Sequence, residues 1–254
     1  MMKQFFLCLQ SEFIKSKSTF ALTGIILMPL TIGIVSFLIF YLKSDYFAAT
    51  ETNMWLLFGG NVFGILTGLL LPFFIIVVSF ANSNLETRAD AWKNLFTLPV
   101  PKSTVYTAKF IFNLLQIAVS LILLCLIIFA DGYLLSIVKP ELRFQDYNES
   151  ALIISFFVKV FISMIGLYSI QSAINILWND FIKSVGLGFL LAVTGLMLTG
   201  WSNGYLFAYS LPGKIAQQFY KEDAIIFNRE AFSSLCWGIL FFAAGFWLVK
   251  RKTG

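Results

Sequence analysis

YTAKFIFNLLQIAVSLILLCLIIFADGYLLSI, residues 106–137, is a long run of mostly apolar side chains whose only charges are Lys109 and Asp131. A helix needs about 20 such residues to cross the hydrocarbon core of a bilayer. Apolar runs also occupy residues 20–42, 56–81, 151–178, 184–201 and 232–249. The sequence therefore predicts an all-α, polytopic membrane protein with six transmembrane helices, which form one transmembrane domain over residues 1–254.

The composition agrees with a membrane protein and argues against several other classes. Hydrophobic residues make up 59% of the chain and charged residues 12%, whereas soluble domains carry about 25% charged residues. The net charge of +5 comes from scattered Lys and Arg, so it does not indicate nucleic-acid binding. The sequence has no histidine, and its three cysteines are widely spaced. We therefore expect neither a metal site nor a catalytic site.

Lys and Arg are distributed unevenly over the segments that join the six runs, which predicts the orientation in the membrane. The richer set includes the two ends of the chain and the connections near residues 88–102 and 183. The other set has fewer basic residues and is diluted by Asp and Glu. Cytoplasmic segments carry the excess of Lys and Arg. Both termini are therefore predicted to lie in the cytoplasm.

Residues 1–19 carry an amphipathic pattern ahead of the first run. Apolar residues recur at helical spacing on one face, and polar residues occupy the opposite face: Phe5, Phe6, Leu9 and Phe13 against Gln4, Ser11, Lys15 and Ser18. The pattern predicts a helix that lies in the headgroup layer, with Lys15 and Lys17 toward anionic lipid. The alternative is that these residues extend the first transmembrane helix.

A second amphipathic stretch lies at about residues 84–98, between the second and third runs. Ser83 and Glu86 match a capping box, and Pro99 prevents the helix from continuing. Two faces alternate between them: Leu85, Ala89, Trp92 and Phe96 against Glu86, Asp90, Lys93 and Thr97. The stretch is either a surface helix resting on lipid or a docking element for a cytoplasmic partner, with Trp92 and Phe96 as anchors.

Three groups of residues inside the runs suggest helix contacts or a pathway. Gly60, Gly64 and Gly68 form a doubled G-x-x-x-G, which suits close helix packing within one subunit or between two permeases. Polar residues of the fourth run must face protein or water, so they either bond neighbouring helices or line a substrate route: Lys159, Ser163, Gln171 and Asn175. Asp131 and Lys159 lie at matching depths, which predicts an ion pair or a shared vestibule.

The chain resembles the permease subunits of ABC-2-type exporters over essentially its whole length. The resemblance lies in Glu12-Phe13-Ile14-Lys15, in the six runs, and in ETRADAWKNLFTLPVPKSTVYTAKF at residues 86–110. Within that segment Glu86, Leu95, Leu98, Pro99, Tyr106 and Lys109 occupy the family's positions. The resemblance implies that residues 84–98 form a coupling helix that contacts an ATPase subunit through Glu86, Ala89, Trp92, Lys93, Phe96, Leu98 and Pro99.

The resemblance also implies the partners. They are two copies of a cytoplasmic ATPase subunit, which bind ATP and Mg²⁺, and a second permease in a homodimer or heterodimer. A phosphate-binding loop of the G-x-x-x-x-G-K-[ST] type is absent from the sequence. Among such permeases, the chain is most similar to those of the bacterial cytoplasmic membrane that export lantibiotics or other antimicrobial peptides. That similarity implies an amphiphilic peptide or lipid-like substrate.

Two other functions are alternatives for a chain of this composition. An ion-coupled secondary transporter commonly contains inverted repeats, and no internal repeat is evident. An intramembrane enzyme needs histidine, paired acids or a serine beside a base within the spans. The sequence has no histidine, and Asp131 is the clear acid within a run.

Overall fold

The structure is a computed structural model that describes residues 2–17, 20–50, 52–88, 101–178, 180–219, 221 and 225–251. Within these ranges the regular elements are helices, and no strand occurs. The longer helices are α1 (Met2–Ser16), α2 (Phe20–Leu42), α4 (Met54–Ile65), α5 (Leu71–Arg88), α7 (Lys102–Val138), α8 (Ser150–Leu177), α9 (Phe181–Leu198), α10 (Leu211–Phe219) and α11 (Arg229–Arg251). Short elements join them: α3 (Ser44–Ala48), η1 (Leu66–Leu70), η2 (Pro140–Leu142), η3 (Phe144–Asp146), η4 (Ser202–Leu206) and η5 (Ala208–Ser210).

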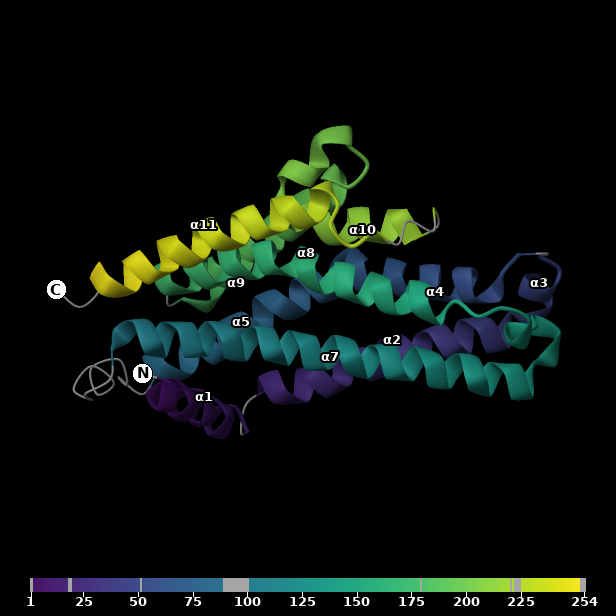
Figure 1. The fold of residues 1–254 in the computed structure, drawn as a ribbon, viewed down its shortest axis with the longest axis horizontal. Helices are drawn as coiled ribbons and strands as arrows, with labels where there is room; N and C mark the ends of the chain where they lie inside the picture. Colours follow the sequence, from purple (N-terminus) through teal and green to yellow (C-terminus); the bar gives the residue numbers. More distant parts are fainter. Residues whose placement is uncertain are drawn as a thin grey trace.

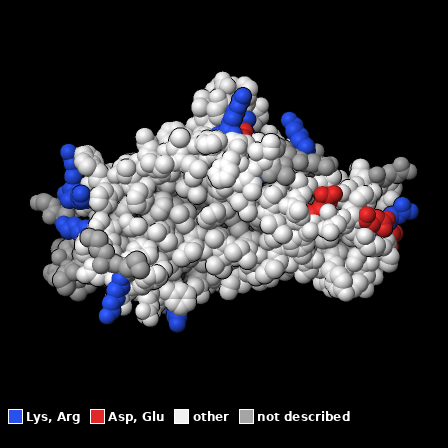
Figure 2. Space-filling model, viewed as in Figure 1, with Lys and Arg blue, Asp and Glu red and all other residues white. Residues whose placement is uncertain are grey.

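Six helical segments of the described chain are long and apolar enough to cross a bilayer, so the prediction of an all-α polytopic membrane protein is confirmed. They are Ala21–Leu42, Met54–Ser83, Lys102–Val138, Ser150–Leu177, Phe181–Leu198 and Arg229–Arg251. Both ends of the chain lie at the same end of the bundle, the left end of Figure 1. In Figure 2 that end carries Lys and Arg, whereas Asp and Glu gather toward the opposite end.

The second span changes its backbone geometry halfway along. Between α4 and α5 the five residues Leu66–Leu70 form a π-helical turn, η1. Pro72 follows as the second residue of α5. Proline has no N–H to donate to the carbonyl four residues earlier and its ring crowds that carbonyl. The wider turn of η1 relieves this crowding, and α4 and α5 run in different directions in Figure 1.

Aromatic side chains form the centre of the core. The rings of Phe63 on α4, Phe156 on α8 and Phe219 on α10 contact one another, with centroids 4.8–5.8 Å apart. All three are fully buried. A Cβ atom at residue 59 would lie 2.6 Å from the ring of Phe219, so a residue larger than glycine would displace this buried ring.

The segment between α9 and α11 combines a buried part, η5 and one face of α10, with an exposed part around η4. On α10, Leu211, Ile215 and Phe219 are fully buried, and the helix packs against α4 and α8. Tyr209 of η5 is also buried. The η5–α10 part of this segment is therefore packed into the bundle, whereas η4 is largely exposed.

Candidate functional site

The predicted coupling helix lies mostly outside the described residues. Ala89, Trp92, Lys93, Phe96, Leu98 and Pro99 all fall in that part of the chain. Residues 84–88 belong to α5, including the backbone of Glu86. The prediction that a helix begins at Ser83 is wrong, because α5 already runs from Leu71 and its earlier turns supply carbonyl partners for the N–H groups near Ser83. The last residues of α5 and the first residues of α7 lie at the end of the bundle that holds both termini (Figure 1).

An ion pair fixes α1 against the start of α7 at that same end. One carboxylate oxygen of Glu12 lies 3.2 Å from Nζ of Lys109, and the other lies 2.8 Å from Nζ of Lys15. The side chains of Glu12 and Lys109 are 7% and 12% exposed. Such a pair has strict geometry because each charge has lost most of its water.

The polar side of α1 faces the protein, and much of its apolar side does not. Glu12 and Ser16 are buried, whereas Phe6 is 61% exposed and Phe13 is 50% exposed. Phe6 and Phe13 of the predicted stripe are therefore only partly covered by the described residues, and they border an open groove between α1, α2 and α7. The helix docks on α7 through a carboxylate, so its attachment depends on Lys109.

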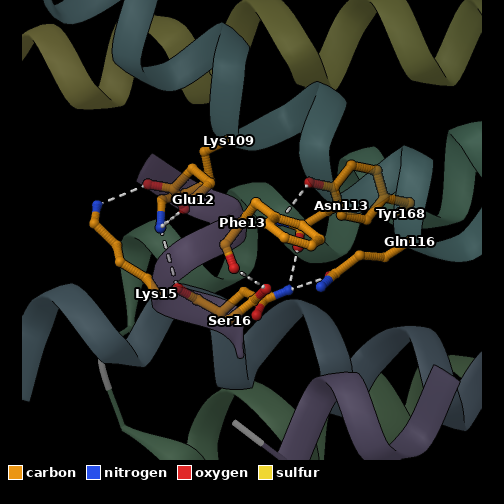
Figure 3. Close-up of polar contacts among 9 residues, drawn as sticks. Glu12, Phe13, Lys15, Ser16, Lys109, Asn113, Gln116 and Tyr168 are labelled. Atoms are coloured by element: carbon orange, nitrogen blue, oxygen red, sulfur yellow. Dashed lines mark hydrogen bonds and ion pairs between the residues drawn. The ribbon is translucent and has the colours of Figure 1, made fainter. Parts of the chain in front are cut away.

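A chain of hydrogen bonds continues from Lys109 into the core (Figure 3). Lys109 donates to the backbone oxygen of Asn82 on α5, at 3.1 Å. The side-chain amide of Asn82 donates to Asn113, and also to Gln116 at 2.6 Å. Asn113 in turn donates to the hydroxyl of Tyr168 on α8, at 3.0 Å. These bonds connect α1, α5, α7 and α8 beside the two helix ends that flank residues 89–100.

The charge of Glu12 is favoured by its partners. Burial alone would raise the pKa of this carboxyl, but the nearby Lys109 and the bond from Lys15 outweigh burial and hold the pKa below its ordinary value of 4.5. A carboxyl whose pKa is lowered in the folded protein contributes stability above its unfolded-state pKa. That contribution is lost as the pH falls through the lowered value.

We expect the docking of α1 to be insensitive to pH above 4.5 and to weaken below it. Spin labels on cysteines introduced at Ser11 and Ser103, both exposed, would report the distance between α1 and α7 by pulsed electron resonance. The distance distribution should stay narrow above pH 4.5 and broaden in acid. Glu12→Gln should give a broad distribution at every pH. Identical acid broadening in Glu12→Gln would contradict the assignment to this carboxyl.

A second buried network joins α5, α8 and α9 with η5. The amide of Gln171 donates to Asn175 at 3.1 Å and to the backbone oxygen of Ser184 at 3.2 Å. Asn175 accepts from the hydroxyl of Ser184 and donates to Ser79 at 2.8 Å. The hydroxyl of Tyr209 donates to Gln171 at 3.1 Å. All five side chains are buried.

The arrangement of Gln171 and Asn175 therefore fits hydrogen bonding between helices, which was the alternative to a substrate route. Ser163 is also buried, and its hydroxyl donates to the backbone oxygen of Val160 on the same helix. A cavity of 20 Å³, large enough for about one water molecule, lies between the two networks. Polar groups on its wall include Ser79, Lys109, Asn113, Ser172 and Asn175.

The predicted ion pair between Asp131 and Lys159 is wrong. A carboxylate oxygen of Asp131 points to α2, where it would lie 3.2 Å from a Cβ placed on Gly33. Nζ of Lys159 lies 4.5 Å from the ring centroid of Phe156, in the cluster with Phe63 and Phe219. The prediction rested on matching depths, but depth does not fix the rotation of each helix about its axis, and the two side chains face different neighbours.

The glycine motif of the second span gives close contact at a different position from the one predicted. A Cβ atom at Gly64 or Gly68 would meet no atom within 4 Å among the described residues, although Gly60 is buried. The close approach is at Gly59, against Phe219. Among the described residues, Gly64 and Gly68 therefore do not pack closely against another helix of the same subunit.

Several residues of the two networks were not selected from the sequence. They are Asn82, Asn113, Gln116 and Tyr168 in the first network, and Ser79, Ser184 and Tyr209 in the second. Glu12 and Lys109 were noted singly but not as partners. The pair could have been predicted from charge, because Glu12 is an acid in α1 and Lys109 is a base two turns into α7, at the same end of the bundle.

Comparison with known proteins gives one match. A family model described as ABC-2 family transporter protein matches residues 8–195, which run from within α1 to within α9. The matched range contains Glu12, Lys109 and both buried networks except Tyr209. No curated protein and no solved structure matches the chain.

Proposed function

Since the chain belongs to the ABC-2 family of transporter proteins and is a multi-pass permease subunit that works with an ATPase subunit, we propose that it exports an amphiphilic substrate. The substrate class we favour is a lantibiotic or another antimicrobial peptide. We place the protein in a bacterial cytoplasmic membrane with both termini in the cytoplasm. The excess of Lys and Arg at the end with the termini supports this orientation (Figure 2).

The observation that carries the proposal is the bonding of Lys109. Its ammonium group contacts Glu12 on α1 and the backbone of Asn82 on α5, while its own backbone belongs to α7. Residues 89–100 connect α5 to α7. A displacement of residues 89–100 would therefore move α5 and α7, and through the bonds of Lys109 it would also move α1. Through the bond between Asn113 and Tyr168 it would move α8.

The mechanism follows from this arrangement. ATP and Mg²⁺ bind to the partner ATPase subunits, and two of these act on a pair of permeases, either identical or related. Closure of the ATPase pair displaces the segment at residues 84–98, with Glu86, Trp92 and Phe96 as its contacts. The six-span bundle then exchanges one packing of α1, α5 and α7 for another, because packed helices move between discrete arrangements.

We expect the double variant Trp92→Ala, Phe96→Ala to lose the ATPase partner, because anchor aromatics contribute much of the energy of an interface. Co-purification of the ATPase subunit with the tagged permease should fall about tenfold or more. The matched control is Trp178→Ala, Phe181→Ala. This second aromatic pair is exposed and lies near the α8–α9 connection at the same end of the bundle.

Retention of the partner by the first double variant, at the level of the unaltered chain, would contradict docking at residues 84–98. The amount of permease in the membrane fraction distinguishes loss of the partner from failure to insert.

A further inference from the structure

A long groove lies between α1, α2 and α7 on the outside of the bundle. Its volume is 650 Å³, and its walls include Phe6 and Phe13 of α1, Leu22 and Ile26 of α2, and Leu115 and Val119 of α7. Phe6, Phe13, Ile26, Leu115 and Val119 each have about half or more of their surface exposed. The described residues therefore leave an apolar groove open beneath the docked α1 helix.

One polar group in the wall of this groove has unused hydrogen-bonding capacity. Gln116 is 5% exposed and lines the groove, and its side-chain oxygen accepts from Asn82. Its side-chain nitrogen has no hydrogen-bond partner among the described residues. A buried N–H without an acceptor is costly in an apolar environment. The nitrogen atom itself is buried, so a carbonyl oxygen in the groove would satisfy it once the Gln116 side chain turns toward the groove.

A positive charge stands at the edge of the same groove. Nζ of Lys17 lies 5.3 Å from the ring centroid of Phe13, which forms part of the wall. Lys17 is exposed, and it follows the end of α1 at Ser16. The groove therefore combines an apolar channel, an N–H donor within its wall and an ammonium group at its rim.

An anionic phospholipid has groups complementary to all three. It presents a phosphate, ester carbonyls and acyl chains along one molecule. We propose that the groove binds one phospholipid of the leaflet that contains α1. Its acyl chain lies between Phe6 and Val119, an ester carbonyl accepts from Gln116, and its phosphate lies near Lys17. The bound chain fills the space between α1 and the α2–α7 pair.

A second groove provides a comparison on the same molecule. It has a volume of 300 Å³, lies between α7 and α8, and is lined by apolar residues and Cys125, with Leu126 on its wall. It has no amide or ammonium group among its lining residues. Ordinary lipid contact would treat the two grooves alike, whereas a specific site would favour the one beside α1.

The test uses the full chain in vesicles of phosphatidylethanolamine that contain a minority of phosphatidylglycerol with a diazirine on its acyl chain. Photolabelled peptides are located by mass spectrometry. We expect label to concentrate on residues of α1, α2 and α7 that border the groove. Val119→Trp, which fills the groove from an exposed position, should lower that label about tenfold, and the control Leu126→Trp should leave it unchanged.

Two further variants test the polar contacts. Gln116→Leu should lower the label about fivefold through loss of the N–H donor. Lys17→Gln should lower the preference for phosphatidylglycerol over labelled phosphatidylethanolamine about fivefold.

Two results would overturn the proposal. One is label spread evenly over the lipid-facing helices and unaffected by Val119→Trp. The other is a disulfide-linked dimer of Val119→Cys in a chain whose three native cysteines are replaced by serine, since a second copy would then cover the groove. Neither result depends on an ATPase partner, so the proposal can fail while the assignment as a permease stands.

Discussion

Lys109→Met is expected to lower the free energy of unfolding of the permease by about 3 kcal/mol, because it removes one partner of a buried ion pair. The variant leaves the Glu12 carboxylate at 7% exposure with Lys15, whose side chain is 33% exposed. It also removes the bond to the backbone oxygen of Asn82. The free energy can be measured by steric trapping in bicelles.

A double-mutant cycle with Glu12→Gln separates the pair from other effects of the substitutions. We expect Glu12→Gln and Lys109→Met to be non-additive by about 1–3 kcal/mol, as residues in direct contact usually are. Lys183→Met is the matched control, since Lys183 is exposed at the same end of the bundle. It should change the free energy by less than about 0.5 kcal/mol. Additive effects in the cycle would show that the contact does not stabilise the fold.

Asn175→Leu is expected to destabilise the bundle by about 3 kcal/mol, because it removes three hydrogen bonds among buried polar groups. Asn175 accepts from Gln171 and Ser184 and donates to Ser79. Thr194→Leu is the control: this threonine is exposed on α9 and bonds the backbone of its own helix. It should be close to neutral.

The same measurement decides the role of the second network. If Gln171 and Asn175 hold α5, α8 and α9 together, the loss appears in the free energy of unfolding. Unchanged stability of Asn175→Leu together with lost transport would instead place Asn175 on a substrate route. The burial of all its bonding partners favours the first outcome.

The sequence was sufficient for the fold class because lipid selects spans by length and apolarity. The run predicted at residues 151–178 is the helix Ser150–Leu177, and the run at residues 106–137 lies inside Lys102–Val138. A bilayer leaves few alternatives for such segments, since each must satisfy its own backbone hydrogen bonds. The family also followed from motifs in the chain, and the match over residues 8–195 confirms it.

Contacts between the helices could not be predicted in the same way. Asp131 and Lys159 were paired by depth, yet each faces another neighbour because rotation about a helix axis is set by packing. In α1 the amphipathic pattern predicted a helix in the headgroup layer, and nothing in that pattern indicated that Glu12 would hold the helix against Lys109 of α7. In the second span the glycine that contacts an aromatic ring is Gly59, one residue before the predicted motif.

The first network shows how two of the motifs that carry the family resemblance are connected in space. Glu12 lies in the motif of α1 and Lys109 in the motif at the start of α7, and the structure brings them into contact. Two motifs that are far apart in sequence are therefore two sides of one ion pair. This contact explains why an acid in α1 and a lysine in α7 belong together physically.

Labelling of a single cysteine at position 92 measures which side of the membrane holds the α5–α7 connection and whether a partner covers it. The variant is Trp92→Cys in a chain whose native cysteines are replaced, treated with a membrane-impermeant maleimide. We expect no reaction in intact cells, rapid reaction in inside-out vesicles stripped of the ATPase subunit, and protection when that subunit is restored. Reaction from outside intact cells would contradict both the orientation and the coupling of residues 84–98 to an ATPase.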